Sequence, residues 1–144
     1  MEKLTKIEWS DSLSIGNKNV DEDHKELIHI YNDLVDLILF EKDNSEFARV
    51  LSRMTDYSLK HFRKEESYMQ RFGYPHIDSH KASHREYIYN VAMYNFDLLG
   101  TTPPEPRKIA KFLGKWWTSH IQKLDLDYEK YHKEVHSKTI YKHM

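Results

Sequence analysis

Residues 61–84 read HFRKEESYMQRFGYPHIDSHKASH, and they are the most informative about the fold because they contain the end of one helix, a tight turn and the start of the next. Apolar residues at helical spacing lead to Gly73 and Pro75, which stop the first helix. A second helix is expected to begin near Asp78 or Ser79, which are good helix-starting residues. The sequence therefore predicts two antiparallel helices joined by a short turn.

Apolar stripes with the same spacing predict two further helices. No competing strand pattern occurs, so we expect an all-α fold, an up-down-up-down four-helix bundle with an N-terminal arm. The whole chain, residues 1–144, is interpreted as one domain with an arm over 1–20, a bundle over about 21–135 and a polar tail over 136–144. The helices are expected over about 21–41, 44–73, 78–100 and 106–135, with Asn44 or Ser45 capping the second.

Composition restricts the function further. The 144 residues are 39% hydrophobic and 31% charged with a net charge of −1, which favours one globular domain without a nucleic-acid or membrane partner. No apolar run approaches the roughly 20 residues that span a bilayer, and the start MEKLTKIEWS lacks a secretory signal, so we expect a cytoplasmic protein. Cysteine is absent, which leaves imidazole and carboxylate as the strong metal ligands.

Ten histidines are a high number for this length, and several lie on the apolar faces of the predicted helices. A spacing of five places His120 and Asp125 about 140° apart on an ideal helix, so joint ligation requires a local widening such as a π-bulge. Asp127 competes with Asp125 for this role. The candidates that face inward are His24 on the first helix, His61 and Glu65 on the second, His80 and His84 on the third, and His120 and Asp125 on the fourth.

Each of these residues, taken singly, is explained by a surface position or an ordinary i,i+4 pair. Together they would place polar groups from four helices in one core, where an unpaired carboxylate costs several kcal/mol. Two divalent metals would compensate them. Five imidazoles, two bridging carboxylates and a bridging hydroxide would leave one octahedral position of the metal pair open for a small ligand, and redox-active iron makes dioxygen the leading candidate.

Three segments resemble bacterial hemerythrins: VDEDHKELIHIYNDL at 20–34, the stretch at 61–84, and WWTSHIQKLDLDY at 116–128. The resemblance extends over roughly residues 8–131. It implies reversible dioxygen binding, for oxygen transport, storage, delivery or sensing, at a non-haem di-iron centre with a bridging hydroxide or oxide. One iron would be held by His80, His84 and His120 and the other, which has the open position, by His24 and His61, with Glu65 and Asp125 bridging.

The resemblance also implies an oxygen pocket that keeps water away from the irons. The family more often has leucine where Trp117 stands and glutamine where Asp23 stands, which affects oxygen affinity more than metal binding. The expected pocket residues are Leu27, Phe62, Trp116, Trp117 and Ile121.

Two other functions remain open at this stage. A di-iron enzyme acting on peroxide, nitric oxide or dioxygen would use the same ligands, and a structural zinc site would give no visible colour. The ferritin-like arrangement of two Glu-x-x-His motifs fits poorly, because neither copy, at Glu26 and at Glu129, is expected beside the inward histidines. A sensing role would require an unknown protein partner, and the oligomeric state is unknown.

The remaining histidines are expected outside the centre. His76 is expected in a loop, and His29 and His143 facing solvent. His132 and His136 are four residues apart, so an accessory surface metal site there is an open alternative.

Overall fold

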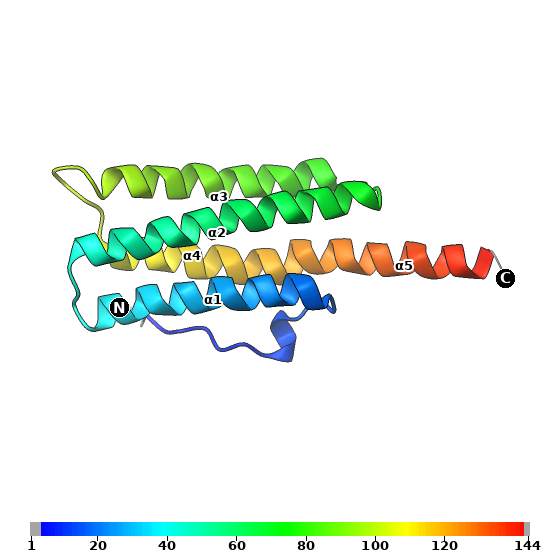
Figure 1. Ribbon diagram of the computed structural model, residues 1–144, viewed down its shortest axis with the longest axis horizontal. Helices are drawn as coiled ribbons and strands as arrows, with labels where there is room; N and C mark the ends of the chain where they lie inside the picture. The colour runs from blue at the N-terminus through cyan, green and yellow to red at the C-terminus, as the bar shows by residue number, and fades with distance from the viewer. Residues whose placement is uncertain (1–3, 143–144) are drawn as a thin grey trace.

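Four helical rods lie side by side in up-down-up-down order in this computed structural model, which describes residues 4–142 and their side chains as far as residue 136 (Figure 1). Within residues 4–142 there is no strand, and no helix is long and apolar enough to cross a membrane. The predicted all-α bundle is therefore confirmed. The rods are α1 (Lys18–Leu39), α2 (Asn44–Arg71), α3 (Ile77–Asp97), and a last rod that joins α4 (Pro106–His120), the π-helical turn η2 (Ile121–Asp125) and α5 (Leu126–Lys142).

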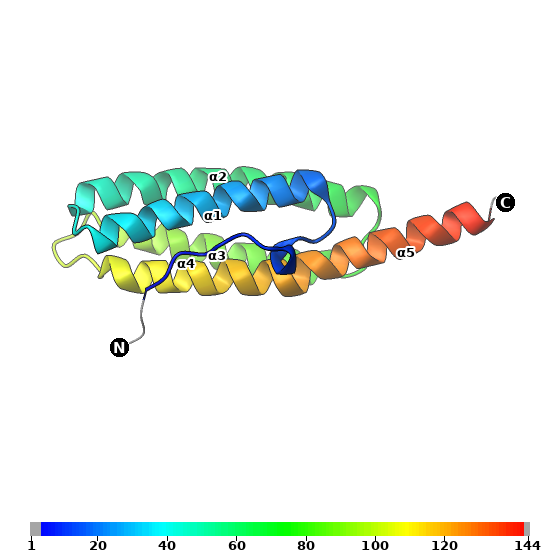
Figure 2. The ribbon, with the colours of Figure 1, turned by 90° about the horizontal axis from the view of Figure 1, so that it is seen from below.

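An N-terminal arm precedes α1 and passes alongside α1 and α4 (Figure 2). It contains a short 3-10 turn, η1 (Asp11–Leu13), and buries Leu4 and Leu13 against the bundle. The Ile7 N–H donates to Asn32 Oδ1 at 2.8 Å, and Asn32 Nδ2 donates to the Ile7 carbonyl at 2.8 Å. These paired hydrogen bonds fix the arm along α1.

The helix starts differ from the predicted ones by a few residues. The first helix begins at Lys18 rather than near Asp21, because the Asn17 side chain accepts from the Val20 N–H at 3.2 Å and caps it. In α2 the cap is Asp43 rather than Asn44 or Ser45.

The helix ends also shift. The third helix ends at Asp97, three residues before Gly100. Gly73 has a φ of +69° and ends α2, as expected for a residue just past a helix. Helix α5 continues to Lys142, through the expected polar tail and beyond the end of the bundle (Figures 1 and 2).

Along the length of the bundle, the core of one half is apolar, and the core of the other half, called the polar half here, contains the buried polar side chains. Buried side chains such as Leu34, Leu51, Val91 and Leu113, none of them exposed, fill the half nearest the α1–α2 turn. Because neighbouring rods are antiparallel, the early part of α1 lies beside the late part of α2, the early part of α3 and the end of α4. These are the parts of the helices that carry the inward histidines.

Candidate metal centre

The polar half contains seven buried side chains, each exposed by 4% or less. Their donor atoms form two groups, and within each group the atoms lie within 4.8 Å of one another. The structure thus brings together all seven residues that the sequence proposed as ligands. They are His24 on α1, His61 and Glu65 on α2, His80 and His84 on α3, His120 at the end of α4, and Asp125 at the end of η2.

The Glu65 carboxylate stands between the two groups. Its Oε1 atom lies 3.0 Å from His80 Nε2 and 2.9 Å from His84 Nε2. Its Oε2 atom lies 3.2 Å from His61 Nε2 on the other side. One oxygen therefore faces each group, which is the arrangement of a bridging carboxylate.

Asp125 is placed in the same way. Its Oδ1 atom lies 3.1 Å from both His80 Nε2 and His120 Nε2, and its Oδ2 atom lies 3.0 Å from His24 Nε2. The π-helical turn makes this geometry, because its wider turn brings His120 and Asp125 onto one face although they are five residues apart. The widening that the spacing required is confirmed.

The donor set fits a pair of metal ions better than it fits internal hydrogen bonding. Among the described side chains, six buried atoms have no hydrogen-bond partner: both ring nitrogens of His24, Nε2 of His61, Nδ1 of His80, and both oxygens of Asp125. Four of them, His24 Nε2, His61 Nε2 and the two Asp125 oxygens, lie within 3.2 Å of an ionisable group without forming a hydrogen bond to it. Buried polar atoms without partners are costly. Nitrogen and oxygen donors of this kind suit iron, zinc and similar transition metals.

Electrostatics in the metal-free centre favour imidazolium facing carboxylate. Burial alone would lower the pKa of His61, but the Glu65 and Asp23 carboxylates raise it to about 10. Burial also opposes the charge on Glu65, yet the nearby histidines hold its pKa well below its usual value. The protons on these imidazoles occupy the positions where metal ions would place positive charge.

Polar residues behind the histidines orient the rings, and their positions in the sequence did not predict these roles. Asp23 Oδ2 accepts from His61 Nδ1 at 2.9 Å, and Glu66 Oε2 accepts from His84 Nδ1 at 2.8 Å. His120 Nδ1 lies 3.1 Å from Ser83 Oγ. Such contacts fix the ring tautomer so that Nε2 points inward. Asp23, Glu66 and Ser83 each stand next to a ligand in the sequence. Each therefore lies about 100° round the helix from that ligand, away from the inward face, so helical spacing gave no reason to select it.

A further partner acts on the bridging carboxylate. The Tyr128 hydroxyl donates to Glu65 Oε2 at 3.1 Å, and burial together with the Glu65 charge raises the pKa of this tyrosine well above its usual value. Tyr128 is fully buried on the last rod, and its hydroxyl contact depends on where α2 lies.

The five expected pocket residues separate into two environments. Leu27, Phe62, Trp117 and Ile121 are buried, at 1–2% exposure, whereas Trp116 is only partly buried. The Trp117 ring centroid lies 6.3 Å from that of His24 and 6.1 Å from that of His61, so it is next to the two-histidine group.

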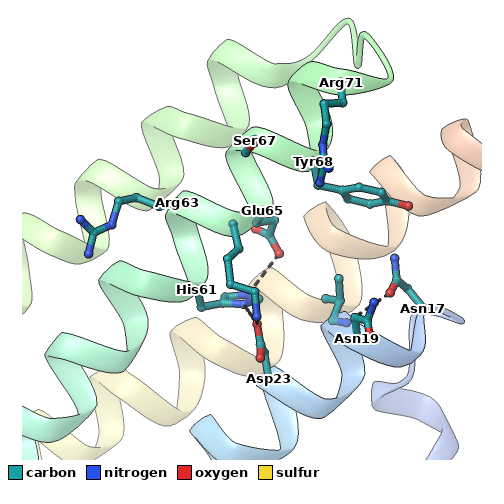
Figure 3. A pocket seen from close by; sticks show the side chains of 11 residues that line it. Asn17, Asn19, Asp23, His61, Arg63, Glu65, Ser67, Tyr68 and Arg71 are labelled. Carbon is teal, nitrogen blue, oxygen red and sulfur yellow. Dashed lines mark hydrogen bonds and ion pairs between the residues drawn. The ribbon is translucent and has the colours of Figure 1, made fainter.

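A groove between the start of α1 and the end of α2 reaches the same group from outside (Figure 3). It has a volume of about 480 Å³, and His61 and Glu65 are among its lining residues. Arg63 and Arg71 are also among its lining residues (Figure 3). Lys64 and Asp23 also line the groove, where Lys64 Nζ pairs with Asp23 Oδ2 at 2.9 Å.

The other histidines lie away from the centre. His29 is 64% exposed, and His76 is the residue before α3, outside the helix as expected. The rings of His132 and His136 lie 6.3 Å apart, but among the described side chains they join no third donor in a metal-sized cluster. Glu129 is buried and accepts a hydrogen bond from Tyr68 at 2.9 Å instead of joining the centre. His143 lies outside the described residues.

Comparisons with known proteins agree with this geometry. Residues 16–131 match the family described as "Hemerythrin HHE cation binding domain". The chain is 28% identical to the Bacteriohemerythrin of Pseudomonas aeruginosa (strain LESB58) over 87% of this chain and 80% of that protein, and 26% identical to a Hemerythrin-like protein of Naegleria gruberi over 84% and 89%. A solved structure titled "Crystal structure of hemerythrin:wild-type" superposes with a TM-score of 0.81 at 25% identity, covering 88% of this chain and 97% of that one.

Proposed function

Because this chain belongs to the hemerythrin family, we propose that it binds dioxygen reversibly at two iron ions. One observation carries the proposal: each of two buried carboxylates gives one oxygen to a three-histidine group and the other to a two-histidine group. Under this proposal His80, His84 and His120 hold one ion, His24 and His61 hold the second, and Glu65 and Asp125 bridge them.

The asymmetry of the histidines determines where a ligand would bind. The two-histidine side has one protein donor fewer, so the open position belongs there. Two ferrous ions in the centre would supply the two electrons that dioxygen accepts when it binds. The Trp117 ring lies beside this side. We propose that it forms, with the buried Leu27, Phe62 and Ile121, an apolar wall that excludes water.

The surrounding polar residues hold the ligands in position rather than react. Asp23 keeps the proton of His61 on Nδ1, so that the Nε2 lone pair faces the centre. Tyr128 donates to the oxygen of Glu65 that faces the same side. We propose a cytoplasmic role in oxygen storage, delivery or sensing, and in the last case with a protein partner.

Iron analysis with an oxygenation spectrum tests the proposal. We expect two iron ions per chain, a visible charge-transfer band when the reduced protein meets oxygen, and loss of that band on degassing. A protein that takes up no iron under reducing conditions, or that takes up zinc alone, would refute it.

The same sample distinguishes an enzyme. Irreversible conversion to the ferric form with oxygen, or turnover of peroxide or nitric oxide by anaerobically reduced protein, would favour the di-iron enzyme.

A further inference from the structure

A pair of stacked rings connects the candidate metal centre with the protein surface. The Trp116 ring lies face to face with the His120 ring, with centroids 4.3 Å apart and an interplanar angle of 13°. His120 points inward, with Nε2 at 3.1 Å from Asp125 Oδ1, and is 4% exposed. Trp116 is partly exposed and lines a surface groove. The two rings thus span the protein shell on this side.

The other stacked ligand provides a contrast. Phe62 lies on the His84 ring with centroids 3.9 Å apart, but Phe62 is 2% exposed and covers its histidine from inside the core. Both rings cover a ligand, and Trp116 also reaches solvent.

The groove above Trp116 is both apolar and basic. It has a volume of about 620 Å³, and Phe112 and Leu124 form apolar walls beside the Trp116 ring. Lys115 and Lys123 also line it, and none of its lining residues is acidic.

The basic character extends beyond the groove. Residues 106–124 contain five cationic side chains and no aspartate or glutamate, although the whole chain has a net charge of −1. A local positive field of this kind attracts acidic partners and speeds their association. The five are Arg107, Lys108, Lys111, Lys115 and Lys123.

We propose that this groove is the docking site for a small acidic one-electron carrier protein, which returns electrons to the oxidised centre through Trp116 and His120. The inference rests on the proposed di-iron function. Electron-transfer complexes use small, transient interfaces, and a single surface groove is enough to form one. Each encounter oxidises the carrier by one electron. Two electrons and one proton from water convert an oxide-bridged ferric pair into the hydroxide-bridged ferrous pair, and no bond of the protein is made or broken.

Reduction kinetics test the electron path in the iron-loaded, oxidised full chain. The probes are anionic iron(II)–EDTA and cationic hexaammineruthenium(II), with rates measured by stopped flow per bound iron. Trp116→Leu should slow reduction by both probes about 10-fold or more, and Trp116→Phe, which keeps a ring against His120, should restore most of the rate. Wild-type rates in Trp116→Leu would overturn the path.

Charge reversal tests the docking surface. Lys115→Glu with Lys123→Glu should slow the anionic probe about 10-fold at low salt and speed the cationic one, and the difference should shrink as salt screens the charges. The matched control is Lys42→Glu with Lys60→Glu, which makes the same charge change at exposed positions outside the groove. Equal effects of the two pairs would overturn the proposal.

A readout that needs no iron completes the test. Metal-free protein is titrated with a plant-type [2Fe–2S] ferredoxin as the acidic probe, and amide NMR signals are followed. Signals from residues 112–124 should shift and broaden in the wild type and not in the Lys115→Glu, Lys123→Glu variant, whereas shifts spread over the whole surface would overturn docking at the groove.

The two proposals fail in different ways. Reversible oxygenation combined with wild-type reduction rates in all variants would refute this inference alone. An irreversible reaction with oxygen, with variant-sensitive reduction, would refute reversible binding and support the docking site, and a chain that binds no iron would refute both.

Discussion

Asp23 is expected to determine how tightly the two-histidine side holds its iron. Its carboxylate accepts from His61 Nδ1 at 2.9 Å and is itself held by Lys64 Nζ at 2.9 Å and the Tyr57 hydroxyl at 3.3 Å. His24, the other histidine on this side, has no partner on Nδ1. Asp23 is thus the one outer hydrogen-bond partner found on this side among the described residues, and it acts on His61.

The perturbation is Asp23→Leu, which keeps a side chain of moderate size and removes the acceptor. Loss of such a partner typically weakens metal binding about 10- to 100-fold, or about 1.4 to 2.7 kcal/mol. The fold should also be destabilised, because the buried Nδ1–H of His61 loses its acceptor, whereas Lys64 is 58% exposed and regains water. We therefore expect selective loss of one iron.

The assay is iron retained per chain during dialysis against increasing concentrations of a ferrous chelator. Asp23→Leu should release one iron about 10- to 100-fold more readily and keep the other. Asp23→Asn, which still offers an acceptor oxygen, should behave nearly as wild type. Glu66→Leu is the matched control, since it removes the partner of His84, where two further histidines remain. Retention of both irons by Asp23→Leu, or their parallel loss, would show that Asp23 does not control iron binding at the two-histidine side.

Three further outcomes are expected. His61→Ala should lower iron loading and destabilise the metal-free fold by roughly 3 kcal/mol in urea unfolding, since it leaves buried charge uncompensated; unchanged iron content would count against the ligand assignment. Trp117→Leu should speed dioxygen exchange, measured by stopped flow, because it opens a void beside the two-histidine side. It should also lower the free energy of unfolding by about 2 kcal/mol, because the void remains and the 3.2 Å hydrogen bond to Tyr87 is lost. Unaltered exchange would place the oxygen pocket elsewhere. Burial opposes the charge on His61 and His80, but the nearby carboxylates outweigh it and raise the pKa of His61 to about 10 and that of His80 to about 9. Protonation of these histidines therefore stabilises the folded state, fully below pH 6.5, and the stabilisation is lost as the pH rises through 9 to 10. The melting temperature of metal-free protein should fall over that range, and a flat profile would contradict it.

Helical periodicity made most of the site predictable. His61 with Glu65, and His80 with His84, are four residues apart, so each pair shares a helix face wherever the helix packs. The five-residue spacing of His120 and Asp125 predicted a widened turn, which the structure has at Ile121–Asp125. Gly73 and Pro75 predicted the turn between α2 and α3, whereas the caps Asn17 and Asp43 were missed because several neighbouring polar residues can cap a helix equally well.

The amino-acid sequence was thus sufficient for the four rods and for the inward faces that carry the five histidines and Glu65, which follow from spacing along each helix, and for the antiparallel order, which follows from the short connections. The tertiary structure alone decided how the oxygens of Glu65 and Asp125 divide between two histidine groups, that Asp23 stands behind His61, and that Trp116 reaches solvent while Trp117 does not. Those facts depend on how far each rod is shifted and rotated against its neighbours. That placement is set by the packing of the whole core.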